Sequence, residues 1–285
     1  GIQGKSKGRI IWREPMTRCA VLGSPIAHSL SPVIHQRAYE ILGWPWQYDR
    51  FDVPSGGLAN FLNANHGNFR GLSLTMPLKE ESLALLSTVT DLAKRVNAVN
   101  TIIFDELGAH GHNTDVQGFM DALGHHQIEI PEVVSILGGG ATARAAIAAV
   151  DGSAKVVNIF SRSEHRANSL VNSAEKSIVR VLPWGEASRA FDAQLTIGTT
   201  PRGATDHIEI AQSSFTYFES LYSPWPTPLL SKWRAAGGLG LDGIDLLVWQ
   251  AIGQLELMAW DSAEVVSHRE ELHGAMRLAA LSHLQ

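Results

Sequence analysis

The chain has 285 residues, of which 45% are hydrophobic and 18% charged, so it can bury cores large enough for two domains. Its net charge of -5 comes without the basic block typical of nucleic-acid binding or the acidic run of a disordered tail. The single cysteine, Cys19, excludes an internal disulfide and favours the reducing cytoplasm. No apolar run is long enough to cross a bilayer, so we expect no membrane partner. Residues 1–16 lack the apolar core of a signal peptide and are interpreted as an extension or as cloning residues.

The first part of the chain alternates short apolar runs with longer amphipathic segments, which predicts alternating strands and helices. Strands are predicted at residues 19–23, 48–53, 71–76 and 97–104, and helices at 31–43, 57–65 and 80–95. Ser31 is the expected N-cap of the first helix, with Pro32 at its first helical position. Pro77 is expected to end the third strand, and Lys79 follows it. This lysine is either a solvated residue beginning an exposed helix or a charge held at the edge of a cleft.

A second unit is predicted to begin near residue 116. It alternates in the same way: strand, glycine turn and alanine-rich helix at 133–150, strand and helix at 156–171, a strand at 194–200, and a long helix within 239–260. The alternation of strands and helices in both units predicts an α/β protein with mostly parallel sheets. No low-complexity linker separates the units, so the joins near residues 116 and 243 are expected to be short hinges.

The glycine turn at residues 138–143 reads GGGATA and matches the pattern G-x-G-x-x-A between a strand and a helix. The first glycine, Gly138, permits the tight turn, and Gly140 lets the backbone approach a pyrophosphate. The helix that follows presents unpaired N–H groups to the anion. The alternative is a strand-to-helix turn with no ligand. The position of the turn favours a dinucleotide site.

The end of the next strand indicates which dinucleotide is bound. An NAD site usually has an acidic residue there, which binds the ribose 2′-hydroxyl. This strand instead ends in Ser161-Arg162-Ser163, and Arg166 follows one turn later. Two guanidinium groups and two hydroxyls suit a 2′-phosphate, although two solvated arginines at a helix start would give the same pattern. The sequence therefore favours NADP over NAD.

Four segments of the first unit carry small polar residues at expected strand ends: residues 23–32, 71–80, 97–101 and 111–115. Strand ends of this kind meet at one crevice of an open α/β sheet. Hydroxyls, amides, one lysine and one aspartate would suit a small polyhydroxylated anion. The scattered histidines lack both the spacing and the carboxylates of a metal site, so no metal is expected.

Taken in order, these segments resemble the shikimate dehydrogenases of the shikimate/quinate dehydrogenase family, over about residues 18–280. The family patterns are G-x-P-x-x-H-S-x-S-P at 23–32, G-x-N-V-T-x-P-x-K at 71–79, G-A-V-N-T at 97–101, G-x-N-T-D-x-x-G at 111–118, Y-x-P-x-x-T-P-L-L at 222–230 and G-x-x-x-L-V-x-Q at 243–250. The chain departs from the residues usual in the family at Ser73 (usually Asn), Asn97 (usually Gly), Ala141 (the fourth residue of the G-A-G-G turn), Gly198 (usually Asn) and Leu246 (usually Met). Ser73 leaves the choice between shikimate and quinate open.

The resemblance implies that Lys79 and Asp115 act on the reacting hydroxyl, with Lys79 either as proton donor or as a fixed positive charge. It also implies substrate contacts from polar side chains of the first unit and the C-terminal part: Ser29, Ser31, Ser73, Thr75, Lys79, Asn100, Asp115, Tyr222 and Gln250. Implied cofactor contacts follow the glycine turn and later strand ends: Gly138, Gly140, Ala141, Ser161, Arg162, Arg166, Thr199, Leu221 and Gly243.

The implied protein has two domains. Residues 17–115 with 244–285 would form an α/β domain with a mostly parallel sheet that binds substrate, and residues 116–243 a Rossmann-like NADP-binding domain. The implied reaction is the reversible, NADPH-dependent reduction of 3-dehydroshikimate to shikimate, in aromatic amino-acid biosynthesis. The alternatives are a quinate/shikimate dehydrogenase that prefers NAD, and a non-catalytic dinucleotide sensor. We expect a cytoplasmic monomer or homodimer that binds no nucleic acid.

Overall fold

The structure is a computed structural model that describes residues 16–284, so the expected extension 1–16 lies outside the described residues except for Met16. The strands are β1 (Arg18–Gly23), β2 (Gln47–Asp52), β3 (Gly71–Leu74), β4 (Thr88–Val89), β5 (Thr101–Asp105), β6 (Gly108–His112), β7 (Val133–Leu137), β8 (Val156–Ser161), β9 (Ile178–Pro183), β10 (Leu195–Gly198), β11 (Thr216–Glu219) and β12 (Leu239–Leu241). The α-helices are α1 (Ser31–Leu42), α2 (Leu58–Ala64), α3 (Leu78–Glu81), α4 (Asp91–Arg95), α5 (Asp115–His125), α6 (Ala141–Val150), α7 (Ala167–Val171), α8 (Pro228–Ala235), α9 (Gly243–Met258), α10 (Ser262–Ser267) and α11 (Arg269–Leu284).

The first sheet has the strand order β2-β1-β3-β5-β6-β4. Strand β1 is parallel to β2 and β3, whereas β5 is antiparallel to both β3 and β6. Ser73 near the end of β3 is therefore paired with Thr101 at the start of β5, and Thr101 is paired in turn with His112 at the end of β6. The residues after β3, before β5 and after β6 consequently meet at one edge of the sheet.

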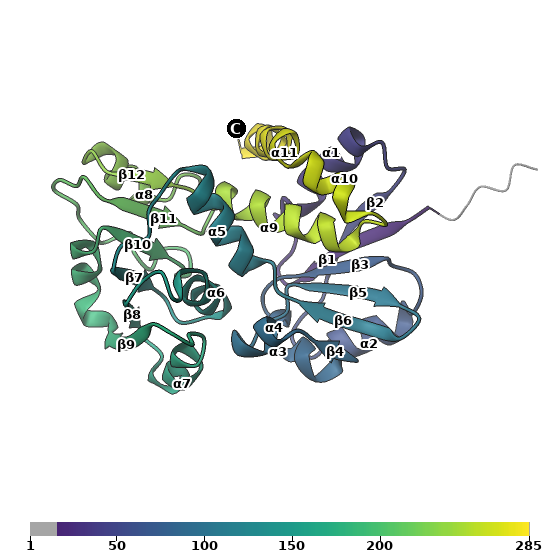
Figure 1. Cartoon of the computed structure of the whole chain (residues 1–285), viewed down its shortest axis with the longest axis horizontal. Helices are drawn as coiled ribbons and strands as arrows, with labels where there is room; N and C mark the ends of the chain where they lie inside the picture. Colours follow the sequence, from purple (N-terminus) through teal and green to yellow (C-terminus); the bar gives the residue numbers. More distant parts are fainter. Residues whose placement is uncertain (1–15, 285) are drawn as a thin grey trace, which may run out of the picture.

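The second sheet has the order β12-β11-β10-β7-β8-β9, and every neighbouring pair is parallel. Counted from β7, this is the doubly wound order 3-2-1-4-5-6, in which ligands bind where the order reverses. That point lies between β7 and β10, and the glycine turn that leads into α6 follows β7. The two sheets stand side by side in Figure 1, with α5 and α9 crossing between them.

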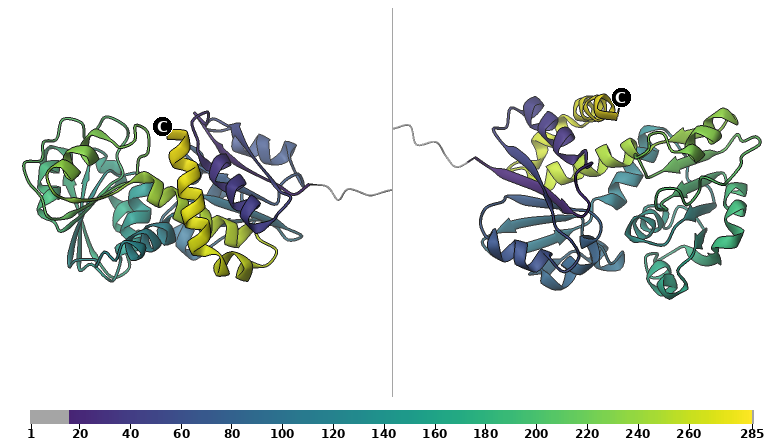
Figure 2. Two further views of the ribbon diagram at one scale, coloured as in Figure 1. Left: turned by 90° about the horizontal axis from the view of Figure 1, so that it is seen from above. Right: turned by 180° about the vertical axis from the view of Figure 1, so that it is seen from behind.

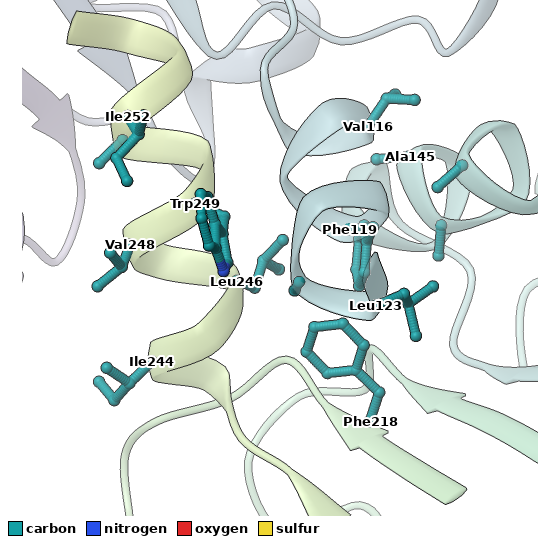
Figure 3. Packing of buried hydrophobic residues seen from close by; sticks show 14 of the residues in the cluster. Val116, Phe119, Leu123, Ala145, Phe218, Ile244, Leu246, Val248, Trp249 and Ile252 are labelled. Atoms are coloured by element: carbon teal, nitrogen blue, oxygen red, sulfur yellow. The ribbon is translucent and has the colours of Figure 1, made fainter. Parts of the chain in front are cut away.

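Helices α5 and α9 pack against each other and join the two sheets through one hydrophobic cluster. Phe119 of α5 contacts Phe218 of β11 edge to face, with ring centroids 5.3 Å apart. In Figure 3 the aromatic rings of Phe119 and Phe218 lie below Val116, and α9 presents Leu246 and Trp249 toward them. The C-terminal helix α11 packs on α1 and α9, as both views of Figure 2 show. None of the helices within residues 16–284 has the length and apolar character needed to cross a membrane.

The predicted helix 80–95 is wrong, because the chain there forms α3, a 3-10 turn at Ser82–Leu85, strand β4 and then α4. The β-branched residues Thr88 and Val89 pair with β6, and Thr90 caps α4 by accepting a hydrogen bond from the Ala93 N–H at 3.3 Å.

Three smaller differences concern element ends. Ser31 is the first residue of α1, not its N-cap, which is Leu30. Strand β3 ends at Leu74, not at Met76, and β5 begins at Thr101, so residues 97–100 are irregular backbone.

The close approach of α5 to α9 depends on Gly118. A Cβ on Gly118 would lie 2.9 to 3.1 Å from the Cβ, N and Cα atoms of Gln250. We expect Gly118→Ala to lower the free energy of unfolding by about 1–3 kcal/mol, because the two helices would have to move apart. Thermal or urea unfolding followed by circular dichroism measures this change.

Gly124 on the same helix provides the control, since a Cβ there would meet no atom within 4 Å. Gly124→Ala should leave stability unchanged or raise it by roughly 0.5–1 kcal/mol through helix propensity. Equal effects of the two alanines would contradict the packing explanation.

Candidate functional site

A lysine–aspartate pair lies at the edge of the first sheet. Lys79 comes from α3, just after β3, and Asp115 is the first residue of α5. The Nζ atom of Lys79 donates a hydrogen bond to Oδ2 of Asp115 at 2.6 Å, and the two side chains are only 16% and 8% exposed. Lys79 is therefore held in a mostly buried ion pair, which rules out the alternative of a solvated surface residue.

The side chain of Asn100 connects this pair to its surroundings. Its Nδ2 atom donates to Oδ1 of Asp115 at 3.0 Å and to Oγ1 of Thr114 at 2.8 Å. Its Oδ1 atom accepts from the Thr114 N–H at 2.8 Å. Gln250 of α9 also lies against it, with its Oε1 atom 3.3 Å from Asn100 Nδ2. Asp115 is thus fixed through both carboxylate oxygens, one to Lys79 and one to Asn100.

Backbone contacts hold the same segments in register. The Val99 N–H donates to the carbonyl of Lys79 at 2.9 Å. The side chain of Asn113 accepts from the Asp115 N–H at 2.9 Å and donates to the Ala98 carbonyl at 3.0 Å. These bonds satisfy an otherwise free N–H at the start of α5, where the negative charge of Asp115 is also favourable.

Ser73, expected to bind substrate, belongs to a buried network. Its hydroxyl donates to Oε1 of Gln254 at 2.9 Å and accepts from the hydroxyl of Tyr48 at 2.6 Å. Ser73 is 4% exposed and Gln254 is 2% exposed. Nε2 of Gln254 donates to the carbonyl of Asn100 at 3.0 Å. The only proton of the Ser73 hydroxyl is therefore in use, and burial raises the pKa of Tyr48 far above its usual value.

Tyr48 and Gln254 were missed by the sequence analysis. Gln254 lies one helical turn after Gln250, so the two amides project from one face of α9. A second glutamine at this spacing in a mostly apolar helix was the signal that could have identified it.

A second group of predicted residues lies beyond β1, where Tyr222 is brought next to Ser29. Burial raises the pKa of Tyr222, while Ser29 and the Leu30 backbone lie against its hydroxyl. Ser29 Oγ accepts from the Ser31 N–H at 3.3 Å. A cavity of about 910 Å³ opens beside them, and its lining includes Ser29 and Tyr222 but neither Lys79 nor Asp115. Of the remaining predicted residues, Thr75 lies between β3 and α3, and its carbonyl accepts from the Leu78 N–H at 2.9 Å.

The glycine turn after β7 packs closely on neighbouring strand ends. Gly138 has a φ of 117°, and a Cβ there would lie 2.4 Å from Oγ1 of Thr199. A Cβ on Gly139 would lie 2.4 Å from Oγ of Ser161. Gly140 is the N-cap of α6 and offers no side-chain cap, so Ala141 begins the helix with its N–H groups uncapped. The turn therefore leaves an anion site at a helix N-terminus.

Two arginines flank this turn. Arg166 lies beside it, since its Nη1 atom is 3.6 Å from the position of a Cβ on Gly140. The guanidinium of Arg162 lies over the ring of Trp184, 5.3 Å from its centroid. Within residues 16–284, neither arginine forms an ion pair with a carboxylate. Both positive charges are available to a phosphate.

The last two predicted cofactor residues meet at the start of α9. A Cβ on Gly243 would lie 2.4 Å from the carbonyl carbon and oxygen of Leu221. The helix is capped by Asp242, whose side chain accepts from the Ile244 and Asp245 N–H groups at 3.0 and 3.2 Å. The absence of a side chain at Gly243 lets the capped helix end rest directly on the backbone after β11.

Comparison with known proteins identifies the family of this chain. Residues 21–102 match the family model described as the shikimate dehydrogenase substrate binding domain. The NADP-dependent shikimate dehydrogenase of Thermus thermophilus is 35% identical over 251 residues, which cover 86% of this chain and 92% of that protein. The chain belongs to the shikimate dehydrogenase family.

Solved structures of this family have the same fold. A Thermus thermophilus shikimate 5-dehydrogenase in complex with NADP(H) and shikimate is 32% identical, with a TM-score of 0.76 over 93% of this chain and 100% of that one. A quinate dehydrogenase from Corynebacterium glutamicum in complex with NAD is 26% identical, with a TM-score of 0.76 over 94% and 99%. Since both superpose equally well, the choice of substrate and cofactor depends on side chains and not on the fold.

The network around Ser73 generates a prediction. Ser73→Ala removes the donor to Gln254 and the acceptor of the Tyr48 hydroxyl, and both groups are buried. We expect the free energy of unfolding to fall by about 1–3 kcal/mol, with KM for shikimate changed by about twofold or less. Urea unfolding and steady-state kinetics on the same preparation measure the two quantities.

Ser135→Ala is the matched control. Ser135 is equally buried, in β7 of the second sheet, and lies outside the network that joins Ser73 to Tyr48 and Gln254. Its loss should cost less than about 1 kcal/mol. A large rise in KM at unchanged stability for Ser73→Ala would identify Ser73 as a direct substrate ligand instead.

Proposed function

We propose that this chain catalyses the reversible reduction of 3-dehydroshikimate to shikimate with NADPH, a step of aromatic amino-acid biosynthesis. The observation that carries the proposal is the buried pair of Lys79 and Asp115 at the edge of the first sheet. Family membership supports it, as do the names of the relatives, which are NADP-dependent shikimate dehydrogenases. A dinucleotide sensor would have no use for such a pair, so a catalytic role is favoured over a sensing role.

The pair can act on a carbonyl that becomes a hydroxyl. When the ketone is reduced, negative charge develops on its oxygen, and the ammonium of Lys79 stabilises that charge. Low exposure strengthens this interaction, because water screens it little. Asp115 holds the ammonium in place while Asn100 fixes its other oxygen. The proton for the new hydroxyl comes from Lys79 or reaches the oxygen through Asp115.

The residues after β7 and β8 fit NADP. Gly138, Gly140 and Ala141 form the open cradle for the pyrophosphate, and Arg162 and Arg166 suit the 2′-phosphate. We assign Ser161 to the same phosphate, and Thr199, Leu221 and Gly243 to the nicotinamide end. NADPH supplies the hydride when bound. The residues of this chain position NADPH and neutralise the negative charge of its phosphates.

We further propose the substrate contacts. Ser29, Ser31 and Tyr222 suit the carboxylate of the substrate, because the hydroxyls of Ser29 and Tyr222 lie together beside a cavity and the side chain of Ser31 lies against Tyr48, which also lines it. Thr75, Asn100, Asp115 and Gln250 suit the ring hydroxyls. Ser73 is assigned to the substrate site as a support for its neighbours, because Gln254 and Tyr48 already hold its hydroxyl.

The proposed domains are 17–115 with 244–285 for substrate, and 116–243 for NADP. This division follows the two sheets, although α5 and α9 pack against each other across it. We propose a monomer or homodimer located in the cytoplasm, where the free, buried thiol of Cys19 stays reduced.

NADP-dependent turnover of shikimate is favoured over NAD-dependent turnover of quinate by the end of β8. That strand end reads Ser161-Arg162-Ser163, with Arg166 one turn later, so no carboxylate stands at the strand end to bind a free 2′-hydroxyl. A single assay that compares shikimate and quinate, each with NADP and with NAD, tests the choice. A larger kcat/KM for quinate with NAD than for shikimate with NADP would overturn it.

The first prediction from this function concerns Lys79. We expect Lys79→Ala to lower kcat by a factor on the order of 10²–10⁴, since it removes the charge that stabilises the transition state. KM for shikimate should change far less. Asp115→Asn should also be slow, and the double variant little slower than the worse single variant. Steady-state kinetics, with circular dichroism to verify folding, measures these effects.

Lys94→Ala is the control, because Lys94 is an exposed lysine of α4. It should stay within about twofold of the unchanged enzyme. A similarly small effect of Lys79→Ala would exclude Lys79 from catalysis.

The second prediction concerns the cofactor. Arg162→Ala should weaken NADP binding by about tenfold or more, the value of one charge-assisted hydrogen bond, and leave NAD binding nearly unchanged. Calorimetric titration with both cofactors measures the difference. Arg180→Ala, at an exposed position within β9, should alter neither affinity. Equal losses for NADP and NAD would show that Arg162 does not recognise the 2′-phosphate.

A further inference from the structure

The side chain of an arginine in helix α6, beside the second sheet, is buried and extends toward the part of the molecule that contains the first sheet. Arg144 lies one turn after the glycine turn, and its N–H donates to the Gly140 carbonyl at 3.1 Å. It is 1% exposed, which is rare for a guanidinium unless every donor finds an acceptor. Its backbone therefore belongs to the first turn of α6, next to the proposed pyrophosphate cradle, while its side chain is occupied elsewhere.

The acceptors of Arg144 come from helix α3 and from the end of α4. Its Nε atom donates to the Val96 carbonyl at 2.6 Å. Its Nη2 atom donates to the Asn97 carbonyl at 3.3 Å and to Oε1 of Glu80 at 2.6 Å. The two carbonyls belong to the C-terminal end of the short helix α4, where carbonyls lack partners within the helix and attract a positive charge.

These acceptors flank the catalytic pair. Glu80 follows Lys79 directly, and Asn97 lies three residues before Asn100, which binds Asp115. The Val99 N–H donates a hydrogen bond to the carbonyl of Lys79, which brings the two ends of the segment together. The guanidinium of Arg144 thus joins the two ends of a loop that carries Lys79 near one end and leads into Asn100 at the other.

The left-handed backbone of Asn97 belongs to the same arrangement. Its φ of 49° lies in the left-handed region, which asparagine adopts more readily than most residues. The turn places consecutive carbonyls of Val96 and Asn97 toward one guanidinium. A planar guanidinium can direct its N–H groups to all three acceptors at once. The single ammonium group of a lysine could not reproduce this geometry.

We propose that Arg144 is a positioning residue that ties the cofactor-binding turn to the loop carrying Lys79 and Asn100. The proposal rests on the function proposed above and extends it. Hydride transfer depends steeply on the placement of the reacting atoms, and a displacement of about 1 Å can cost on the order of 10²-fold in rate. Arg144 fixes this placement from the cofactor side without contact to the cofactor or the substrate.

The test compares Arg144→Met and Arg144→Lys with the unchanged enzyme. We expect kcat to fall by about tenfold to a hundredfold in both variants, with the dissociation constants of NADP and shikimate within about threefold. The kinetic isotope effect with NADPH deuterated at the transferred position should rise, because hydride transfer becomes more strongly rate-limiting.

Hydrogen–deuterium exchange supplies a readout that does not depend on turnover. In the unchanged protein, NADP should slow exchange in peptides covering residues 78–100, since the cofactor turn and the loop are linked. In Arg144→Lys this slowing should be lost, although NADP still binds. If Arg144→Met fails to fold, Arg144→Lys retains the charge and decides the outcome alone.

Glu175→Gln is the matched control. Arg95, which is partly buried, forms an ion pair with the exposed Glu175 at 2.5 Å, and this pair also connects α4 to the part of the chain that follows α7. Breaking it should leave kcat, isotope effect and exchange unchanged. Variants of Arg144 that lose only thermal stability, with normal kcat and normal NADP-dependent exchange, would overturn the proposal. An unchanged enzyme that reduces no 3-dehydroshikimate yet shows the linked exchange would refute the proposed function and leave the link intact.

Discussion

The carboxamide of Asn100 is the single interaction on which the rest of the site depends. One planar group contacts Thr114 and Asp115 after β6 and Gln250 of α9, and its backbone carbonyl accepts from Gln254. Because β5 runs antiparallel to its neighbours, its first residues lie at the same edge as the last residues of β3 and β6. The orientation of one strand therefore decides that a lysine, an aspartate and two glutamines from distant parts of the chain share one small volume. A buried amide whose donors and acceptors are all in use also has few alternative orientations, so the ion pair beside it is held in a defined geometry.

Much of this arrangement could be predicted from the sequence, since strand and turn patterns are local. The glycine turn and the long helix α9 were found where predicted, because each depends on the residues within it. The predicted helix 80–95 failed because the pairing of Thr88 and Val89 with β6 is a long-range contact that no local pattern reports. The polar ends were expected to converge as carboxyl ends of parallel strands. Asn100 instead precedes a strand, and antiparallel pairing brings it to the same place.

The site residues also differ in whether local sequence was enough to identify them. Lys79 and Asp115 carry their chemistry in their side chains and could be identified from residue type and family resemblance. The position of Ser73 was also identified, but its partners were not, because a hydroxyl acquires its role from whatever surrounds it. Gln254 and Tyr48 come from α9 and β2, far from Ser73 in the chain. Arg144 was not identified from the sequence for a related reason. An arginine in an alanine-rich helix after a glycine turn is expected to be solvated, and only the structure shows that α4 covers it.

The buried thiol of Cys19 has a practical consequence for spectroscopy. Cys19 lies in β1 with no exposed surface, and burial raises its pKa to about 11, so almost none of it is thiolate at neutral pH. Maleimide and nitroxide reagents need an accessible thiolate. New cysteines placed at exposed positions, one on each sheet's half of the molecule, would therefore be labelled selectively without removing the natural one. Distances between such labels could then be followed by fluorescence transfer or electron spin resonance in an otherwise native protein.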